Sequence, residues 1–171
     1  MEESALFKLT HGLYILGSRD ESGRFVGSTI DAVMQVSNKP LYIAVSCHNT
    51  SYTKEAIEKC GELSISILGC SVNPFVIGNF GFQSSRTIDK WKNVEFFTED
   101  NLPFLKENIA IIKGKVLSKE VLGTNTLFIV EVTDCRNTKE EGTITYNEYR
   151  CSFKNEVFKA MEDYRKSLVN K

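Results

Sequence analysis

Short runs of hydrophobic and β-branched residues, separated by glycine, proline and asparagine, dominate the first half of the chain. Runs bounded in this way are typical of β-strands, and the alternation in LSISIL is typical of a strand with one buried face. The turn-rich stretch Asp20–Gly23 lies between two of the runs and predicts a hairpin. The expected strands are residues 12–18, 24–29, 32–37, 41–47 and 63–68.

Two longer β-like stretches follow at residues 109–121 and 126–135. In the second, Phe128, Val130 and Val132 share one face, because side chains alternate along a strand. The neighbouring positions share the other face. No repeat, low-complexity tract or linker divides the sequence, so we expect one domain over residues 1–171.

Three segments have helical patterns. Residues 51–60 are expected to begin at a cap, Ser51 or Thr53, and to end at Gly61. Asn73-Pro74 predicts a short helix that continues to about residue 79, since proline is favoured at the first helical position. Hydrophobic residues at helical spacing predict a C-terminal helix at about 155–169. The sequence therefore indicates an antiparallel β-barrel with helical additions.

Composition excludes some classes of partner. The 171 residues are 42% hydrophobic and 25% charged, with a net charge of −1, as in ordinary globular proteins. No basic footprint for nucleic acid is present. The longest purely apolar run near the N-terminus, Leu13–Leu16, is too short for a signal peptide or a membrane span. We expect a cytoplasmic protein that binds neither nucleic acid nor membrane.

The usual catalytic motifs are missing from the sequence. Five cysteines occur without a CxxC pair, which favours free thiols and no metal site. Cys47 and His48 are neighbours on an expected strand, so their side chains point to opposite faces. Neither a dinucleotide fingerprint nor a P-loop is found. This pattern suits a protein whose cofactor supplies the chemistry, and no residue can be named as catalytic.

Five stretches, in order, suggest a family. They are HGLYILGS, TIDAVMQVSNKP, VSCHNTSYTKEAI, IGNFGFQSSRTIDKW, and LGTNTLFIVEVTDC with TITYNEY, and they extend from about residue 6 to residue 153. In these stretches the chain resembles the flavin reductase family with the FMN-binding split-barrel fold. Within that family it is most similar to the flavin domain of the high-molecular-weight rubredoxins, of the NADH:rubredoxin oxidoreductase type.

The resemblance implies a fold and an activity. It implies a mainly β, Greek-key antiparallel split barrel with a few helices, assembled as a homodimer that holds FMN near the subunit interface. NAD(P)H would pass hydride to the flavin, and the electrons would go to a rubredoxin-like carrier, free flavin, oxygen or ferric iron. Two alternatives stay open: an electron-transfer protein without its own nicotinamide site, and a binding protein that has lost flavin.

The resemblance also implies site residues. The ring contacts would be Thr29, Ile30, Asp31, Ala32 and Gln35. The ribityl chain and phosphate would be reached by Ser46, Cys47, His48, Asn49, Ser51 and Thr53, where a helix start also favours an anion. A second clamp for the anion would be formed by Ser84, Ser85 and Arg86. The alternative for this loop is a surface turn held by an ion pair between Arg86 and Asp89.

Some positions depart from the family pattern. Ser85 stands where relatives usually have glycine, and Asp31 where they tend to have an amide. An ionised Asp31 cannot donate a hydrogen bond and would repel a reduced, anionic flavin, so we expect a lowered flavin potential. Tyr146 and Tyr149 match a family pattern near the nicotinamide, although core packing is the more common role for such residues. For Trp91, packing is favoured over shielding of the flavin. The paired cysteines of a rubredoxin domain are missing, so a separate electron acceptor is expected.

Overall fold

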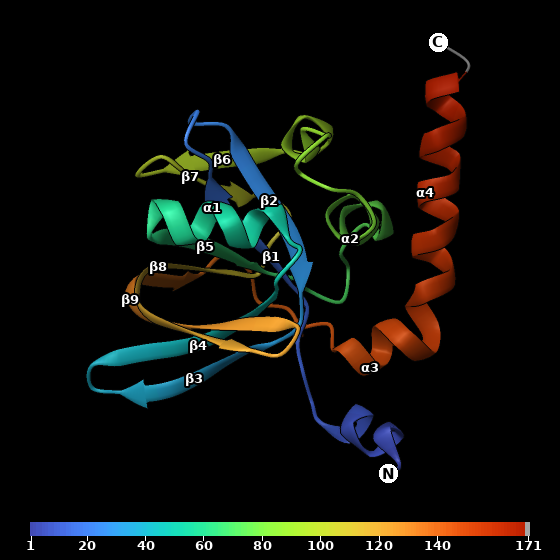
Figure 1. Cartoon of the computed structure of the whole chain (residues 1–171). Coiled ribbons are helices and arrows are strands. Elements are labelled where there is room, and N and C mark those ends of the chain that lie inside the picture. Colours follow the sequence, from blue (N-terminus) through green and yellow to red (C-terminus); the bar gives the residue numbers. More distant parts are fainter. Residues whose placement is uncertain (170–171) are drawn as a thin grey trace.

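A seven-stranded antiparallel sheet forms the body of the molecule (Figure 1). The structure, a computed structural model, describes residues 1–169. The strands pair in the order β2-β1-β5-β8-β9-β4-β3. They are β1 (Tyr14–Arg19), β2 (Phe25–Ile30), β3 (Val33–Asn38), β4 (Leu41–His48), β5 (Glu62–Ile67), β8 (Ala110–Leu122) and β9 (Asn125–Asn137). The expected mainly β, antiparallel architecture is confirmed.

The strand pairings follow the hydrophobic pattern. β1 and β2 form the expected hairpin, with Tyr14 opposite Ile30 and Arg19 opposite Phe25. β8 and β9 pair along nearly their whole length and are joined by a turn in which Gly123 has a φ of 58°. Along β9 the buried positions alternate as expected, with Phe128 and Val130 fully buried.

Capping residues explain where the two helices beside the sheet begin. α1 (Tyr52–Cys60) starts at Ser51, whose side chain accepts a hydrogen bond from the Lys54 amide, and it ends at Gly61 in the left-handed conformation. The Asn73 side chain caps α2 (Pro74–Gly81). Both helices match the expectation.

The remaining helical segments lie at the two ends of the described chain and before β6. They are η1 (Glu3–Lys8), η2 (Lys90–Asn93), α3 (Tyr146–Glu148), η3 (Tyr149–Phe153) and α4 (Lys154–Val169). The C-terminal helix α4 is the one expected at about 155–169. Among residues 1–169, no helix is both long enough and apolar enough to cross a membrane.

One element was not expected from the sequence. β6 (Phe96–Glu99) and β7 (Leu102–Leu105) form a separate two-stranded hairpin whose turn residues, Asp100 and Asn101, have positive φ. Each strand has only four residues, too few for a clear alternation. All four residues of β7 are buried, and Ser64 and Ser66 of β5 hydrogen-bond to its backbone. Packing of this hairpin against β5, which is distant in the sequence, therefore stabilises it.

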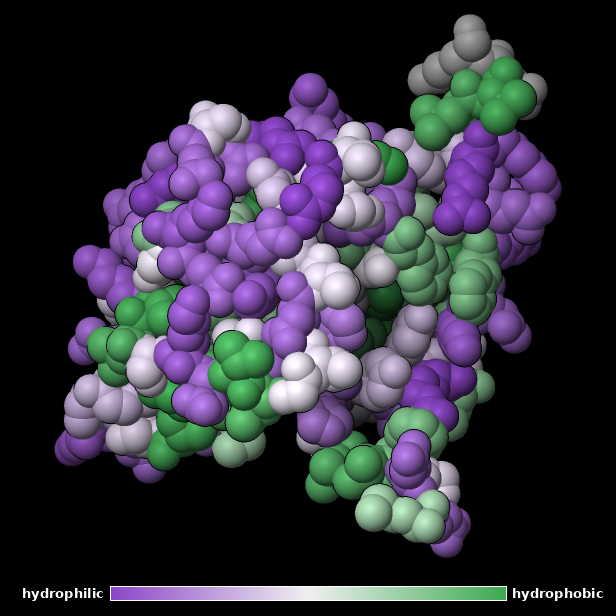
Figure 2. Space-filling view, in the orientation of Figure 1, coloured by the Kyte–Doolittle hydropathy of each residue, from purple (hydrophilic) through white to green (hydrophobic). Residues whose placement is uncertain are grey.

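The core has two main parts, one on each face of the sheet. On β1, Ile15 packs with α2, Trp91 and α4, whereas Leu16 packs inside the barrel with Ile57 of α1 and Phe128 of β9. Trp91 is almost completely buried, so its packing role is confirmed. α4 lies along α2 at one side of the molecule (Figure 1). Figure 2 shows a hollow between this helix and the body, with hydrophobic atoms at its floor.

Candidate functional site

A cavity of about 360 Å³ opens where β2, the end of β4, the start of α1 and the end of α2 meet. Its volume lies in the range of small-molecule and cofactor sites. Eight of the residues expected from the sequence line it, and these are Thr29, Ile30, Cys47, His48, Ser51, Thr53, Ser84 and Ser85. The lining also includes Ser28, Thr50, Tyr52, Phe80, Gly81, Phe82, Gln83 and Lys90. We call this space the first cavity.

The start of α1 gives the first cavity one end suited to an anion. Ser51, Tyr52 and Thr53 line the cavity at the first turn of the helix, where backbone N–H groups lack helical partners. The helix dipole adds a partial positive charge at the same place. An anionic group bound here would be stabilised by both effects.

Lys90 adds a buried positive charge to the same cavity. Only 3% of its surface is exposed, and its Nζ donates hydrogen bonds to the carbonyl oxygens of Gly27 (2.9 Å) and Phe80 (2.8 Å). Burial lowers the pKa of Lys90 to about 8. Lys90 is thus a residue of the cavity wall, and within residues 1–169 both hydrogen bonds of its ammonium go to carbonyl oxygens rather than to a carboxylate.

The loop after α2 brings Ser84 and Ser85, but not Arg86, to the wall of the first cavity. The Ser85 hydroxyl is buried and exchanges two hydrogen bonds with the backbone of Gly27, so it joins the loop to β2. Ser84 is exposed, and its hydroxyl accepts a hydrogen bond from the Arg86 amide.

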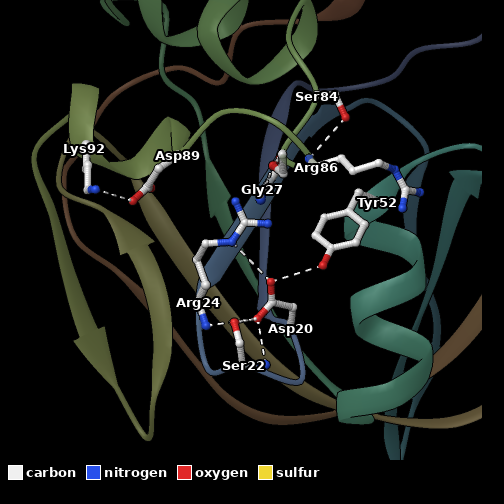
Figure 3. A network of polar contacts seen from close by, with 10 residues as sticks. Asp20, Ser22, Arg24, Gly27, Tyr52, Ser84, Arg86, Asp89 and Lys92 are labelled. Atoms are coloured by element: carbon white, nitrogen blue, oxygen red, sulfur yellow. Dashed lines mark hydrogen bonds and ion pairs between the residues drawn. The ribbon is translucent and has the colours of Figure 1, made fainter.

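Arg86 extends away from this loop toward α1 (Figure 3). Its guanidinium lies 4.7 Å from the centre of the Tyr52 ring and donates to Glu55 at 2.6 Å. The suggested pair between Arg86 and Asp89 is therefore wrong, because Asp89 pairs with Lys92 instead. Tyr52, a cavity residue, donates in turn to Asp20.

A second cavity, of about 250 Å³, adjoins the first. The two cavities share four wall residues, and these are Thr29, Ile30, Gly81 and Phe82. The rest of the second lining is Leu13, Asp31, Ile77, Tyr146 and Tyr149. It is thus mostly hydrophobic and aromatic, with one carboxylate. Tyr146 and Tyr149 stack at 5.8 Å, so they pack together and also face this space.

Five expected residues line neither cavity, and these are Ala32, Gln35, Ser46, Asn49 and Arg86. Their polar groups have partners within the protein. The Gln35 amide donates to Asn38. Asn49 donates to the Gly123 carbonyl and accepts from Thr126, so its amide holds the β8–β9 turn. Their role as cofactor contacts stays a prediction.

Cys47 lines the first cavity, but its thiol is not reactive. The side chain is 3% exposed, and burial raises its pKa to about 12. It stays protonated at neutral pH and cannot act as a thiolate nucleophile. His48, the next residue, is exposed and hydrogen-bonds to Thr50. A buried Cys47 beside an exposed His48 is the expected result for neighbours on a strand, whose side chains point to opposite faces.

The two cavities together fit a flavin mononucleotide. The first supplies a helix start and a buried ammonium for a phosphate, with hydroxyl groups between them, and the shared wall supplies apolar surface for a ring system. Lys90 and Phe82 are the main residues that sequence reasoning missed. The signal available was the stretch DKW, in which a lysine stands beside a residue expected to be buried.

Comparisons with known proteins identify the family of the chain. A family model described as the flavin reductase like domain matches residues 6–154. The ferric-chelate reductase (NAD(P)H) of Archaeoglobus fulgidus is 32% identical over 151 residues, which cover 87% of this chain and 89% of that protein. The high molecular weight rubredoxin of Moorella thermoacetica is 33% identical over 151 residues, 87% of this chain and 66% of that protein.

Solved structures give the same answer for the fold. The structure of flavin reductase PheA2 in its native state matches with a TM-score of 0.72 and 27% identity, over 85% of this chain and 93% of that one. The expected flavin reductase split-barrel fold is thereby confirmed. From the family match over most of its length, the chain belongs to the flavin reductase-like domain family and is an oxidoreductase of that type.

Proposed function

We propose that the protein is an FMN-dependent oxidoreductase that takes hydride from NAD(P)H and passes electrons to a separate acceptor. The observation that carries this proposal is the pair of adjoining cavities. The first ends in a helix start and the buried Lys90 ammonium, and the second is a smaller aromatic space beyond a shared wall. One suits a nucleotide with a phosphate, and the other suits a second flat ring.

The chain's own residues bind and orient the reactants. Lys90 and the N–H groups at the start of α1 would hold the phosphate, and Thr29 with Ile30 would border the ring system. When bound, FMN would supply the hydride acceptor, so the step would need no protein acid or base. The wall residues would lower the barrier by fixing the orientation of both reactants.

The acceptor is proposed from the relatives. The names of the two curated proteins point to a ferric chelate and to a rubredoxin. We therefore propose a rubredoxin-like carrier or a ferric chelate as the electron acceptor. The five free cysteines support a cytoplasmic location.

We also propose a homodimer. β3 is an edge strand of the sheet, with Met34 and Val36 exposed on it, and the far part of β8 exposes Leu117 and Val121. Exposed apolar side chains on an unpaired edge are a liability unless a partner covers them. Sedimentation of the purified protein should give about twice the mass of the 19.3 kDa chain. A monomer at micromolar concentration would contradict this part of the proposal.

Steady-state assays test the proposed activity. NADH and NADPH oxidation would be followed with added FMN and, in turn, ferric citrate, rubredoxin or oxygen as acceptor. We expect FMN-dependent oxidation of a nicotinamide nucleotide with at least one acceptor. A protein that binds FMN but oxidises neither nucleotide would instead be an electron carrier without its own nicotinamide site.

A further inference from the structure

An aromatic pair joins the C-terminal helix to the wall between the two cavities. Phe82, at the end of α2, lines both cavities. The ring of Phe158, on α4, stacks on it with 5.1 Å between centroids and 20° between planes. Phe82 is 37% exposed and Phe158 is 52% exposed, so both rings reach the surface of the protein.

The backbone that carries Phe158 is firmly held. Its neighbour Val157 is fully buried, and Met161, one turn later, is 1% exposed. Both pack closely on Gly78 of α2, where a side chain would collide with Met161. Phe158 therefore projects from a fixed helix, while Phe82 lies just beyond the last turn of α2 and has an open side toward solvent.

The residues that line the two cavities indicate which ligand the contact between Phe82 and Phe158 would affect. The groups suited to a phosphate, Lys90 and the start of α1, belong to the first cavity, whereas Phe158 lines neither cavity. The second cavity offers Leu13, Ile77 and two tyrosines, and Phe82 completes it. A flat ring that enters the second cavity depends on aromatic contact more than on charge.

We propose that Phe158 is a positioning residue that fixes the Phe82 ring in the shared wall, and that this sets how well the flat ring of the hydride donor fits the second cavity. The inference rests on the proposed function and deepens it, because it makes α4 an element that governs the second substrate. Loss of the Phe158 ring leaves Phe82 free to turn toward solvent. The donor ring then loses one wall, whereas FMN keeps its phosphate contacts.

A matched control exists on the same two helices. Phe75 of α2 and Tyr164 of α4 form another aromatic pair, with centroids 4.9 Å apart, and neither residue lines either cavity. Removing the Tyr164 ring weakens the packing of α4 on α2 without touching Phe82. The control variant is Tyr164→Ala, and the test variants are Phe158→Ala and Phe158→Leu, with Phe158→Tyr as the conservative replacement.

The experiment measures the FMN dissociation constant by fluorescence, and KM and kcat for NADH with FMN saturating. For Phe158→Ala and Phe158→Leu we expect KM to rise roughly three- to tenfold, the factor that one aromatic contact is worth. The FMN dissociation constant should change less than KM does, since FMN keeps its phosphate contacts and the other residues of the shared wall. Phe158→Tyr should restore KM, and Tyr164→Ala should leave it unchanged while lowering Tm.

Two results would overturn the inference. KM for the Phe158 variants could equal that of the wild type, or Tyr164→Ala could raise KM as much as Phe158→Ala does, which would make α4 a structural element only. A different result would refute the proposed function itself: wild-type protein that binds no FMN, or that binds it and oxidises no nicotinamide nucleotide. The wild-type assay thus separates the two failures.

Discussion

Asp31 places a carboxylate at the second cavity, next to two residues of the shared wall. A negative charge near a flavin opposes the addition of electrons, because the reduced flavin is itself anionic. Replacing Asp31 by Asn removes this charge and adds an amide that can donate a hydrogen bond. We predict that Asp31→Asn raises the midpoint potential of bound FMN by about 30 mV or more, equivalent to about 1.4 kcal/mol for two electrons.

Anaerobic redox titration of the FMN-loaded protein measures this shift. Asp134→Asn is a suitable control, since Asp134 is a partly exposed residue of β9 that pairs with Arg136 and lines neither cavity. The midpoint potential of FMN bound to Asp134→Asn should match that of FMN bound to the wild type. An unchanged midpoint in Asp31→Asn would mean that solvent screens the carboxylate from the ring.

The buried Lys90 makes two properties depend on pH, the stability of the fold and the affinity for FMN, and the two effects have opposite signs. Its pKa is about 8 in the folded protein, below the ordinary value of 10.5, because burial disfavours the charge. Between these two values the unfolded chain binds more protons, so the contribution of Lys90 to the free energy of unfolding increases as pH rises. Binding of a phosphate needs the charged form, so FMN affinity should decrease over the same window.

We predict that the FMN dissociation constant rises by up to about tenfold per pH unit above pH 8. Lys90→Met should weaken FMN binding at pH 7 and remove this dependence. It should also destabilise the protein by about 1–3 kcal/mol, because the carbonyls of Gly27 and Phe80 lose their donor. Lys92→Met is the control, since Lys92 is exposed. Fluorescence titrations between pH 7 and 9 in which Lys90→Met keeps the wild-type pH dependence would contradict the assignment.

At the scale of single residues, the sequence predicts only part of the candidate site. The short-range pattern offered Ser51 or Thr53 as the cap of α1, and the structure selects Ser51. The pattern also placed Cys47 and His48 on opposite faces of a strand. It could not identify Lys90 as buried, because its carbonyl partners include Gly27, 63 residues away in the chain. Nor could the pattern show that the Asn49 side-chain amide donates its hydrogen bond to the Gly123 carbonyl in the β8–β9 turn.

Among the elements, α2 and α4 are tied together at Gly78. A β-carbon at this position would overlap the Met161 side chain and come within 3.2 Å of Val157. Both residues are buried, so neither can move away without cost. We predict that Gly78→Ala destabilises the protein by about 1–3 kcal/mol and displaces α4.

Chemical denaturation measures the loss of stability. Gly123→Ala would not serve as its control, because Gly123 has a positive φ that alanine adopts with strain. Gly81→Ala is better matched, since its β-carbon would make only an ordinary contact with Thr29 at 3.6 Å. Equal destabilisation by both variants would show that helix packing at Gly78 is not tight.

Elements differ in how far local sequence determines them. The strands of the sheet, α1, α2 and α4 have clear alternation, caps or helical spacing, and the sequence predicts all of them. The β6–β7 hairpin has none of these signals. It is stabilised by burial against β5, through the Ser64 and Ser66 hydroxyls. Such contacts depend on the assembled fold and are invisible in a local pattern.

For the whole molecule, the arrangement of the two cavities follows from topology. β2 and the end of α2 are far apart in sequence, yet Thr29 donates to the Ile77 carbonyl and Ser85 joins the following loop to Gly27. These contacts place the shared wall between a polar space and an aromatic one. Under the proposed function, the first cavity would hold the nucleotide and the second would hold the donor ring, and the fold places the two side by side.

The most direct test is the visible spectrum of the FMN-loaded protein under strictly anaerobic conditions, recorded before and after addition of NADH, with NADPH in parallel. We predict rapid bleaching of the flavin absorbance by at least one of the two nucleotides. A bound flavin that stays oxidised with both would contradict the account, and would assign the protein to electron carriers that another reductase must reduce.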